Sequence, residues 1–319
     1  MVRHPIKVSN KKLVLDLIQN NDNFLFDCDG VIWLDNKLIP GVLGTLNYLK
    51  SMKKNCIFIT NNSSKSRLDY VSKFQSLGVN DVGLDNIYPT SYAIALYVRD
   101  VLKLPKGSKI WILGEKGIEI ELKELGYVPL GGTDKRLDVP FDTSNELLSI
   151  DPEVKAVVVG STKDLNYMRI SLTLLYLLHE NKSLPFIGAN IDRSYPGPHG
   201  LTLPAGGCVV KFMEYAADRV AENIGKPSTV FLDTILKSRG FDRQRTLMIG
   251  DTLYTDIKFG NDGNLGSGKG TLLVFTGGTK KEAFEHLLSK EDKDKETESG
   301  IPSFYMDSLD DIVRIIEEY

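Results

Sequence analysis

Residues 24–31, Phe24-Leu25-Phe26-Asp27-Cys28-Asp29-Gly30-Val31, join a short apolar run to two carboxylates and a glycine. Similar apolar runs recur along the chain, at Cys56 to Ile59, Ile110 to Leu113, Ala156 to Val159, Thr246 to Ile249 and Leu272 to Phe275. Continuous runs of this kind are typical of strands buried on both faces of a parallel sheet. Stretches with helical periodicity lie between them, for example Leu43 to Met52, Ser66 to Leu77 and Leu309 to Glu318. The alternation predicts a doubly wound α/β fold.

The ends of these strands indicate where a site should lie. Three of the runs end in Asp or in Thr-Asn-Asn, and polar groups at the carboxyl ends of parallel strands gather in one crevice. The long interval between Thr60 and Asp251 holds at least two further βα units. It therefore favours a second domain inserted into the first, with edges near 103–107 and 196–200.

Composition limits the class of protein. The chain has 319 residues, which suggests about two domains. Its net charge of -3 provides no basic field for nucleic acid or an anionic membrane. Three scattered cysteines argue against a disulfide scaffold and suit a reducing cytosol. The N-terminus lacks a secretory pattern, and Ile170 to Leu178 is far shorter than the ~20 residues of a spanning helix. We expect a cytoplasmic protein, with a nuclear location also compatible, and neither nucleic-acid nor membrane partners.

The first candidate residues are Asp27 and Asp29. At the end of a strand, one carboxylate could attack an electrophile or hold a metal while the other moves protons. The alternative is an ordinary turn, because Asp often bonds its own backbone there.

Two further segments could bind an anion. Thr60-Asn61-Asn62 precedes the predicted helix from Ser66, whose start would present free N–H groups to an anion, although a plain N-cap is the alternative. In Gly225-Lys226-Pro227, the proline fits a first helical position, so Lys226 would lie where the helix dipole disfavours a cation. A ligand phosphate would remove that conflict; a solvated surface lysine is the other reading.

The last segment suggests a cation site. Asp251 ends an apolar run and Asp256 lies five residues further on. The pair could supply and support a hard-cation site, since Mg²⁺ prefers oxygen ligands.

Taken in order, these segments resemble the haloacid dehalogenase superfamily of phosphatases. Within it, the sequence is similar to the eukaryotic p-nitrophenylphosphatase and phosphoglycolate phosphatase family, on residues 24–31, 59–67, Gly225-Lys226-Pro227 and Gly250-Asp251 with Thr255-Asp256. The resemblance covers nearly the whole chain, from about residue 20 to 319. It implies a Rossmann-like core with an inserted α/β cap, which we place at 105–203, leaving 1–104 and 204–319 as the core.

The resemblance also implies roles. Asp27 would be the nucleophile that forms an aspartyl-phosphate, and Asp29 the general acid and then base. Mg²⁺ would bind the Asp27 carboxylate, the Asp29 main-chain carbonyl and the Asp251 carboxylate, with Asp256 supporting them. Lys226, Thr60, Asn61 and Asn62 would contact the phosphoryl oxygens. The substrates implied are small phosphomonoesters such as p-nitrophenyl phosphate and phosphoglycolate-like metabolites.

The cap would select the substrate and close over the crevice, and homodimerisation through the cap is expected from the resemblance. Two departures affect the substrate. Ser161-Thr162 follow the cap glycine where relatives usually have an aromatic or leucine and Asp, so Asp164 is carried over only as a substrate contact of lower weight. Thr252 stands where Arg or Asn is common.

Other functions are compatible with parts of this pattern. A phosphomutase would pass the phosphoryl group to a sugar hydroxyl, and a non-catalytic phosphate-binding or signalling module would keep it. The loop 263–270 nearly matches a Walker A loop but has Gly270 where Ser or Thr is needed, and it precedes a strand. Cys28, between two carboxylates, is expected to pack and not to react.

Overall fold

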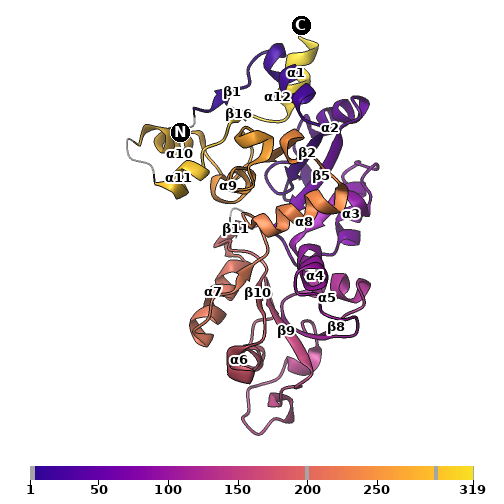
Figure 1. The fold of residues 1–319 in the computed structure, drawn as a ribbon, viewed down its shortest axis with the longest axis vertical. Coiled ribbons are helices and arrows are strands. Elements are labelled where there is room, and N and C mark those ends of the chain that lie inside the picture. Colours follow the sequence, from indigo (N-terminus) through magenta and orange to yellow (C-terminus); the bar gives the residue numbers. More distant parts are fainter. Residues whose placement is uncertain (1–3, 198–200, 291–293, 319) are drawn as a thin grey trace. The chain divides into compact units, whose positions relative to one another are not determined.

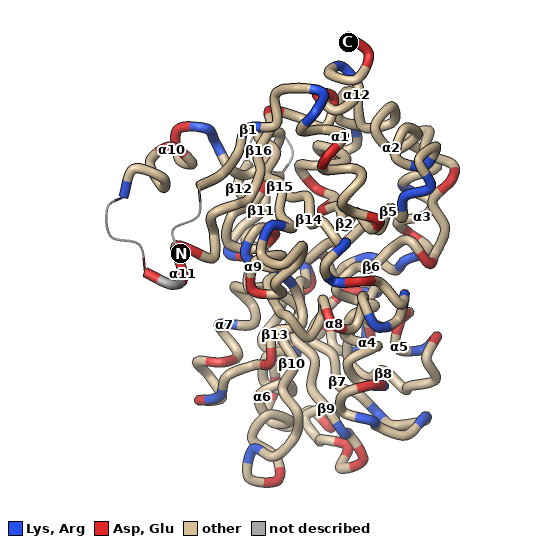
Figure 2. Tube along the Cα trace, turned by 45° about the horizontal axis from the view of Figure 1, so that its top comes forward, with Lys and Arg blue, Asp and Glu red and all other residues tan. Residues whose placement is uncertain are grey.

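The computed structural model describes residues 4–197, 201–290 and 294–318, and it divides into two compact units (Figure 1). The first unit takes in residues 1–60, 73–87 and 226–319; the second takes in 61–72 and 88–225. Lys and Arg are interspersed with Asp and Glu over both units (Figure 2), as the small net charge suggests. Within the described ranges, no helix is both long enough and apolar enough to cross a bilayer.

The first unit is built on a seven-stranded sheet. Its order is β1 (Ile6–Lys7), β16 (Phe304–Met306), β15 (Thr271–Val274), β14 (Thr246–Gly250), β2 (Asn23–Asp27), β5 (Asn55–Thr60) and β6 (Ile87–Pro89). The strand pairs whose register is described are all parallel, with Ile249 beside Phe26 and Ile59 beside Asp27. The strand order reverses between β14 and β2. In doubly wound sheets, ligands bind outside the carboxyl ends of strands at such a reversal.

Helices cover both faces of this sheet, because neighbouring residues of a strand point to opposite faces. Leu272 of β15 borders the same small apolar void as Leu17 of α1 (Lys11–Asn20) and Ile312 of α12 (Asp310–Glu317). The next residue, Leu273, packs instead with Ile257 and with Phe284 of α10 (Lys281–Ser289). This two-sided burial explains the continuous apolar runs. Further strands and α-helices of the unit are β3 (Trp33–Leu34), β4 (Lys37–Leu38), α2 (Val42–Ser51), α8 (Thr229–Arg239), α9 (Lys258–Asp262) and α11 (Lys295–Ser299).

The second unit has its own parallel sheet of five strands. Its order is β13 (Glu222–Asn223), β10 (Phe186–Gly188), β9 (Val154–Val159), β7 (Lys109–Leu113) and β8 (Val128–Gly131). Its core joins Trp111 and Val157 of the sheet to Leu172 of α6 (Tyr167–Lys182) and Met213 of α7 (Gly206–Ala217). Further elements are α4 (Thr90–Asp100), α5 (Lys116–Glu124) and a hairpin of β11 (Ser194–Pro196) and β12 (Thr202–Pro204); α3 (Arg67–Ser76) is shared between the two units' residue ranges.

The predicted fold class is confirmed: a doubly wound parallel-sheet core is interrupted by a second α/β unit. The three predicted helices are α2, α3 and α12, each within one residue of its expected ends. The second unit covers more of the chain than 105–203, since its sheet reaches Asn223 and its contacts include 61–72. The bounds 105–203 stay a prediction of which part acts as a cap.

Candidate active site

Two neighbouring strands of the first unit end in carboxylates. Asp27 is the last residue of β2 and Asp251 directly follows β14. Their side chains are largely buried, with Asp27 at 7% and Asp251 at 5% exposure. Because β2 and β14 are paired in parallel, both carboxylates lie at the same edge of the sheet, where the strand order reverses.

Lys226 joins this pair as a buried cation. Its ammonium forms ion pairs with Asp27 Oδ1 and, at 2.7 Å, with Asp256 Oδ1, and the residue is only 2% exposed. The two sequence readings of this residue both need correction. Lys226 is not a solvated surface lysine, and it is not at a helix start, because α8 begins only at Thr229 with Ser228 as its N-cap. Two carboxylates already compensate its charge.

Asp256 holds the turn that follows β14. Its Oδ2 accepts hydrogen bonds from the backbone N–H groups of Asp251 and Thr252, both at 3.1 Å, while its Oδ1 faces Lys226. One side chain therefore fixes the backbone that carries Asp251 and the lysine that faces Asp27. The geometry suits the supporting role expected for it.

The residues at this edge fit a divalent cation. Asp27, Asp251 and Asp256 each offer a carboxylate oxygen within 4.8 Å of the others, and all three are buried. Three carboxylates with one lysine leave an excess of buried negative charge, which is costly without a further cation. An all-oxygen donor set is the kind that Mg²⁺ prefers.

Burial also changes the protonation of these groups. It raises the pKa of Asp27 well above its ordinary value, against the opposing effect of Lys226, and the neighbouring carboxylates add to the rise. Burial and the nearby Asp256 raise the pKa of Asp251 to about 7. For Lys226, burial alone would lower the pKa, but Asp256 and Asp27 outweigh it and raise the pKa. The ammonium is therefore kept charged.

Asp29 lies on the turn after β2, and its orientation depends on Trp33. The Cys28 carbonyl accepts backbone N–H groups at the turn, from Ile32 at 2.9 Å and Trp33 at 3.2 Å. The Trp33 indole N–H donates to Asp29 Oδ1 at 2.8 Å. Trp33 itself is fully buried and packs edge-on against Phe74 of α3. An exposed carboxylate is thus held by a rigid, buried ring.

The loop after β15 completes the site and was missed from the sequence. Asp251 Oδ2 accepts a hydrogen bond from the backbone N–H of Gly278, and the Thr276 hydroxyl donates to the Gly30 carbonyl. The run Leu272 to Phe275 ends in Thr276-Gly277-Gly278. The carboxyl end of this strand should lie at the same edge of the sheet as the others. It was not made a candidate because glycine has no side chain that could bind or react.

Thr60 ends β5 beside β2 and is 2% exposed. Asn61 and Asn62 follow it along the chain but pack within the second unit. The Asn61 amide donates to Asp192 Oδ1 at 3.3 Å, and Asn62 Oδ1 accepts from the backbone N–H and the hydroxyl of Ser64.

The start of α3 differs from expectation. The Arg67 N–H donates to Glu121 Oε1 at 2.6 Å, and the Ser66 N–H donates to Asp69 Oδ2 at 2.9 Å. The expectation that this helix start presents free N–H groups to an anion is therefore wrong for these two groups.

Two other residues were singled out in the sequence, Asp164 and Cys28. Asp164 belongs to the second unit, with its side chain 57% exposed and 3.7 Å from the Lys135 ammonium. Cys28 is fully buried, and burial with the adjacent carboxylates raises the pKa of its thiol well above the ordinary value, consistent with packing.

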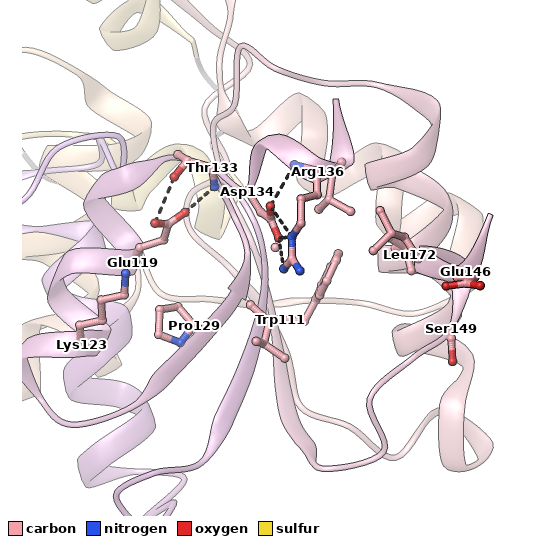
Figure 3. Close-up of a pocket in the computed structure, with 14 residues that line it drawn as sticks. Trp111, Glu119, Lys123, Pro129, Thr133, Asp134, Arg136, Glu146, Ser149 and Leu172 are labelled. Carbon is pink, nitrogen blue, oxygen red and sulfur yellow. Dashed lines mark hydrogen bonds and ion pairs between the residues drawn. The ribbon is translucent and has the colours of Figure 1, made fainter. Parts of the chain in front are cut away.

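A hollow of about 410 Å³ lies in the second unit, and none of the three clustered carboxylates borders it. Trp111, Pro129 and Leu172 border it. Four of its polar residues form two pairs: Glu119 accepts from Thr133, and Arg136 pairs with Asp134 (Figure 3). The chemistry of the carboxylates lies in the first unit instead.

Comparison with known proteins identifies the family to which the chain belongs. Residues 24–128 match the family model described as haloacid dehalogenase-like hydrolase, and residues 223–311 match one described as HAD-hydrolase-like. The chain is 37% identical to 4-nitrophenylphosphatase of Schizosaccharomyces pombe over 95% of this chain and 97% of that protein. It is 38% identical to phosphoglycolate phosphatase 2 of Arabidopsis thaliana over 97% of each.

A solved structure is also similar. The p-nitrophenyl phosphatase from Archaeoglobus fulgidus superposes with a TM-score of 0.75 at 26% identity, covering 92% of this chain and 99% of that one. This chain is therefore similar to these phosphatases, in sequence or in fold, over more than nine tenths of its residues.

Proposed function

Because this chain belongs to the haloacid dehalogenase-like hydrolases, we propose that it is a Mg²⁺-dependent phosphatase that hydrolyses small phosphomonoesters through an aspartyl-phosphate. The observation that carries the proposal is the buried Asp27 carboxylate, ion-paired to Lys226 at the sheet edge it shares with Asp251. We infer p-nitrophenyl phosphate and phosphoglycolate-like metabolites as the substrate class, from the names of the relatives.

In the first step, an Asp27 carboxylate oxygen attacks phosphorus while the bond from phosphorus to the leaving oxygen breaks. Asp29, as a carboxylic acid, donates its proton to that leaving oxygen. The product alcohol departs and the phosphoryl group stays on Asp27. The hydrogen bond from Trp33 to Asp29 Oδ1 leaves the other carboxyl oxygen for the proton.

In the second step, Asp29 works in the opposite direction. Its carboxylate takes a proton from a water molecule as the water oxygen attacks phosphorus. The bond from phosphorus to the Asp27 oxygen breaks, which restores the Asp27 carboxylate and gives inorganic phosphate.

Positive charge is needed because a phosphate dianion repels a carboxylate nucleophile. The Lys226 ammonium next to Asp27 offsets that repulsion and stabilises the equatorial oxygens. Thr60, Asn61 and Asn62 are proposed to donate to the same oxygens. Asp27, Asp251 and the Asp29 main-chain carbonyl would hold Mg²⁺, which when bound supplies further charge neutralisation.

Hydrolysis is favoured over the two alternatives. The relatives reported above are all named phosphatases, and none of those names is a mutase or a signalling protein. Asp29, held by a buried ring, is the group that would speed loss of the phosphoryl group to water, which a stable phosphorylated module would avoid.

The test is Asp27→Asn, which keeps the shape of the side chain and removes the nucleophile. We expect turnover of p-nitrophenyl phosphate with Mg²⁺ to be abolished while circular dichroism stays that of the wild type. Asp85→Asn, at an exposed position of the same unit, should retain full activity. Retention of more than about 5% of the rate by Asp27→Asn would reject the assigned nucleophile.

A further inference from the structure

Glu121 of α5 is a buried carboxylate that the mechanism above does not use. It is 2% exposed, and both of its oxygens accept hydrogen bonds from one residue. Oε1 accepts the backbone N–H of Arg67 at 2.6 Å and Oε2 accepts the side-chain Nε–H of Arg67 at 3.0 Å. A carboxylate this deeply buried is stable only when its partner is held in place.

Arg67 is held from its other side by an aromatic ring. Its guanidinium carbon lies 3.6 Å from the centre of the Tyr92 ring, on α4. Cation–π contact and the ion pair together restrict both the backbone and the side chain of this residue. Arg67 is the first residue of α3 and directly follows the segment 61–66, so fixing Arg67 fixes one end of that segment.

The same two helices hold the segment just before Arg67. The Gly117 N–H of α5 donates to the Ser64 carbonyl at 3.0 Å, and the Ser91 hydroxyl of α4 donates to the Lys65 carbonyl at 2.7 Å. A Cβ on Gly117 would lie 2.5 Å from the Lys65 backbone, so the approach is close. Gly117 and Ser91 bond only backbone carbonyls of the segment. Glu121 differs from them because it places a buried charge next to the Arg67 guanidinium.

We propose that Glu121 is a positioning residue for the segment 61–66, acting through Arg67. The inference rests on the proposed function, in which Asn61 and Asn62 of this segment donate to phosphoryl oxygens. A small displacement of such donors lowers the stabilisation of the bound phosphoryl group. Glu121 therefore contributes to phosphate affinity although it does not touch the substrate.

The decisive variant is Glu121→Gln. It keeps the size of the side chain and an acceptor for the Arg67 N–H, but it removes the charge that faces the guanidinium. We expect the Kd for inorganic phosphate, measured by calorimetry with Mg²⁺, to rise by about tenfold or more. The KM for p-nitrophenyl phosphate should rise with it. Glu124→Gln, an exposed residue of the same helix, should change neither.

A merely structural role for Glu121 predicts a different result. Loss of folded protein lowers the number of binding sites and the apparent kcat, but it leaves Kd and KM unchanged. An unchanged Kd in folded Glu121→Gln would therefore overturn the proposal. If that variant does not fold, Arg67→Lys takes its place, because lysine keeps the charge but cannot make the same paired contacts; an unchanged Kd there overturns the proposal as well.

A double variant tests the path through Arg67. If Glu121 acts through Arg67, Arg67→Ala combined with Glu121→Gln binds phosphate no more weakly than Arg67→Ala alone. If the losses of phosphate affinity in the two single variants add up in the double variant, Glu121 does not act through Arg67. Wild-type protein that binds phosphate but does not turn over p-nitrophenyl phosphate would reject the proposed function, while the comparison of Kd values would still decide the role of Glu121.

Discussion

Lys226 shows how burial decides the role of one side chain. A lysine with water around it is a surface charge, but this one is almost fully buried between Asp27 and Asp256. Its charge is kept because both partners oppose the effect of burial on its pKa. A motif made Lys226 a candidate, but its burial depends on a contact with Asp27, 199 residues away in the chain, which no local sequence pattern contains.

Trp33 offers a test of the acid at Asp29. Trp33→Phe keeps most of the buried ring but removes the N–H that donates to Asp29 Oδ1. We expect kcat/KM for an alkyl phosphomonoester to fall about tenfold, within the usual range for general acid catalysis. For p-nitrophenyl phosphate the loss should be smaller, because p-nitrophenolate leaves readily without a proton.

The control for Trp33→Phe is Trp111→Phe, whose indole N–H bonds Thr173 in the second unit and not Asp29. Trp111→Phe should either leave kcat/KM unchanged or change it by the same factor for both substrates. Equal losses with both substrates in Trp33→Phe would show that the ring only packs.

Among the elements, the loop after β15 has a tight steric requirement. A Cβ on Gly277 would lie 2.0 Å from Asp251 Oδ2 and 2.7 Å from the Gly30 Cα. Gly30, with a positive φ of 90°, meets the same carboxylate from the turn after β2. Two turns from distant parts of the chain are thus pressed against one side chain.

Gly277→Ala should displace the Asp251 carboxylate. We expect the activity with p-nitrophenyl phosphate to fall by about a hundredfold or more, as for a displacement of about 1 Å in an active site. The concentration of Mg²⁺ that gives half-maximal activity should rise. Gly83→Ala, where only Asn86 lies nearby at 3.8 Å, is the matched control and should leave both values unchanged. Wild-type kinetics in Gly277→Ala would show that the loop can move away without displacing the Asp251 carboxylate, which contradicts the prediction.

The sequence predicted long elements better than short ones. The apolar runs and the periodic helices were found because each repeats a pattern over several residues. Strands β1 and β13 have two residues each, and β10 has three, so they carry no periodicity of their own. They can be recognised as strands only from their hydrogen bonds to a neighbouring strand in the structure. The glycines at 277 and 278, whose backbones come close to Asp251, escaped prediction for another reason, because glycine carries no side-chain chemistry.

For the whole molecule, the buried carboxylates link stability to pH. The pKa of Asp251 is raised to about 7 and that of Asp27 is raised in the same direction. A carboxyl group with a higher pKa in the folded state binds its proton more tightly there than in the unfolded chain. Its contribution to stability is therefore present near pH 4 and is lost as the pH rises towards 7.

We accordingly expect metal-free protein to unfold at a lower temperature at pH 7.5 than at pH 5, measured by calorimetry in chelator. The difference in free energy of unfolding should be on the order of a few kcal/mol, since one pKa unit corresponds to about 1.4 kcal/mol. Asp251→Asn should reduce this dependence. Added Mg²⁺ should raise the unfolding temperature most at the higher pH, because it binds the carboxylate form. An unfolding temperature of the metal-free wild type that does not change between pH 5 and pH 7.5 would contradict the raised pKa values of Asp27 and Asp251.

The pairing of β2 with β14 has a consequence during synthesis on the ribosome. β2 emerges early, but its neighbour lies 223 residues further along the nascent polypeptide, beyond the entire second unit. Until translation has passed Gly278, Asp27 and Lys226 lack the strand and loop that complete their surroundings. The growing chain must therefore keep one side of an apolar central strand unpaired until 223 further residues have been added, and the carboxylate cluster can assemble only after that.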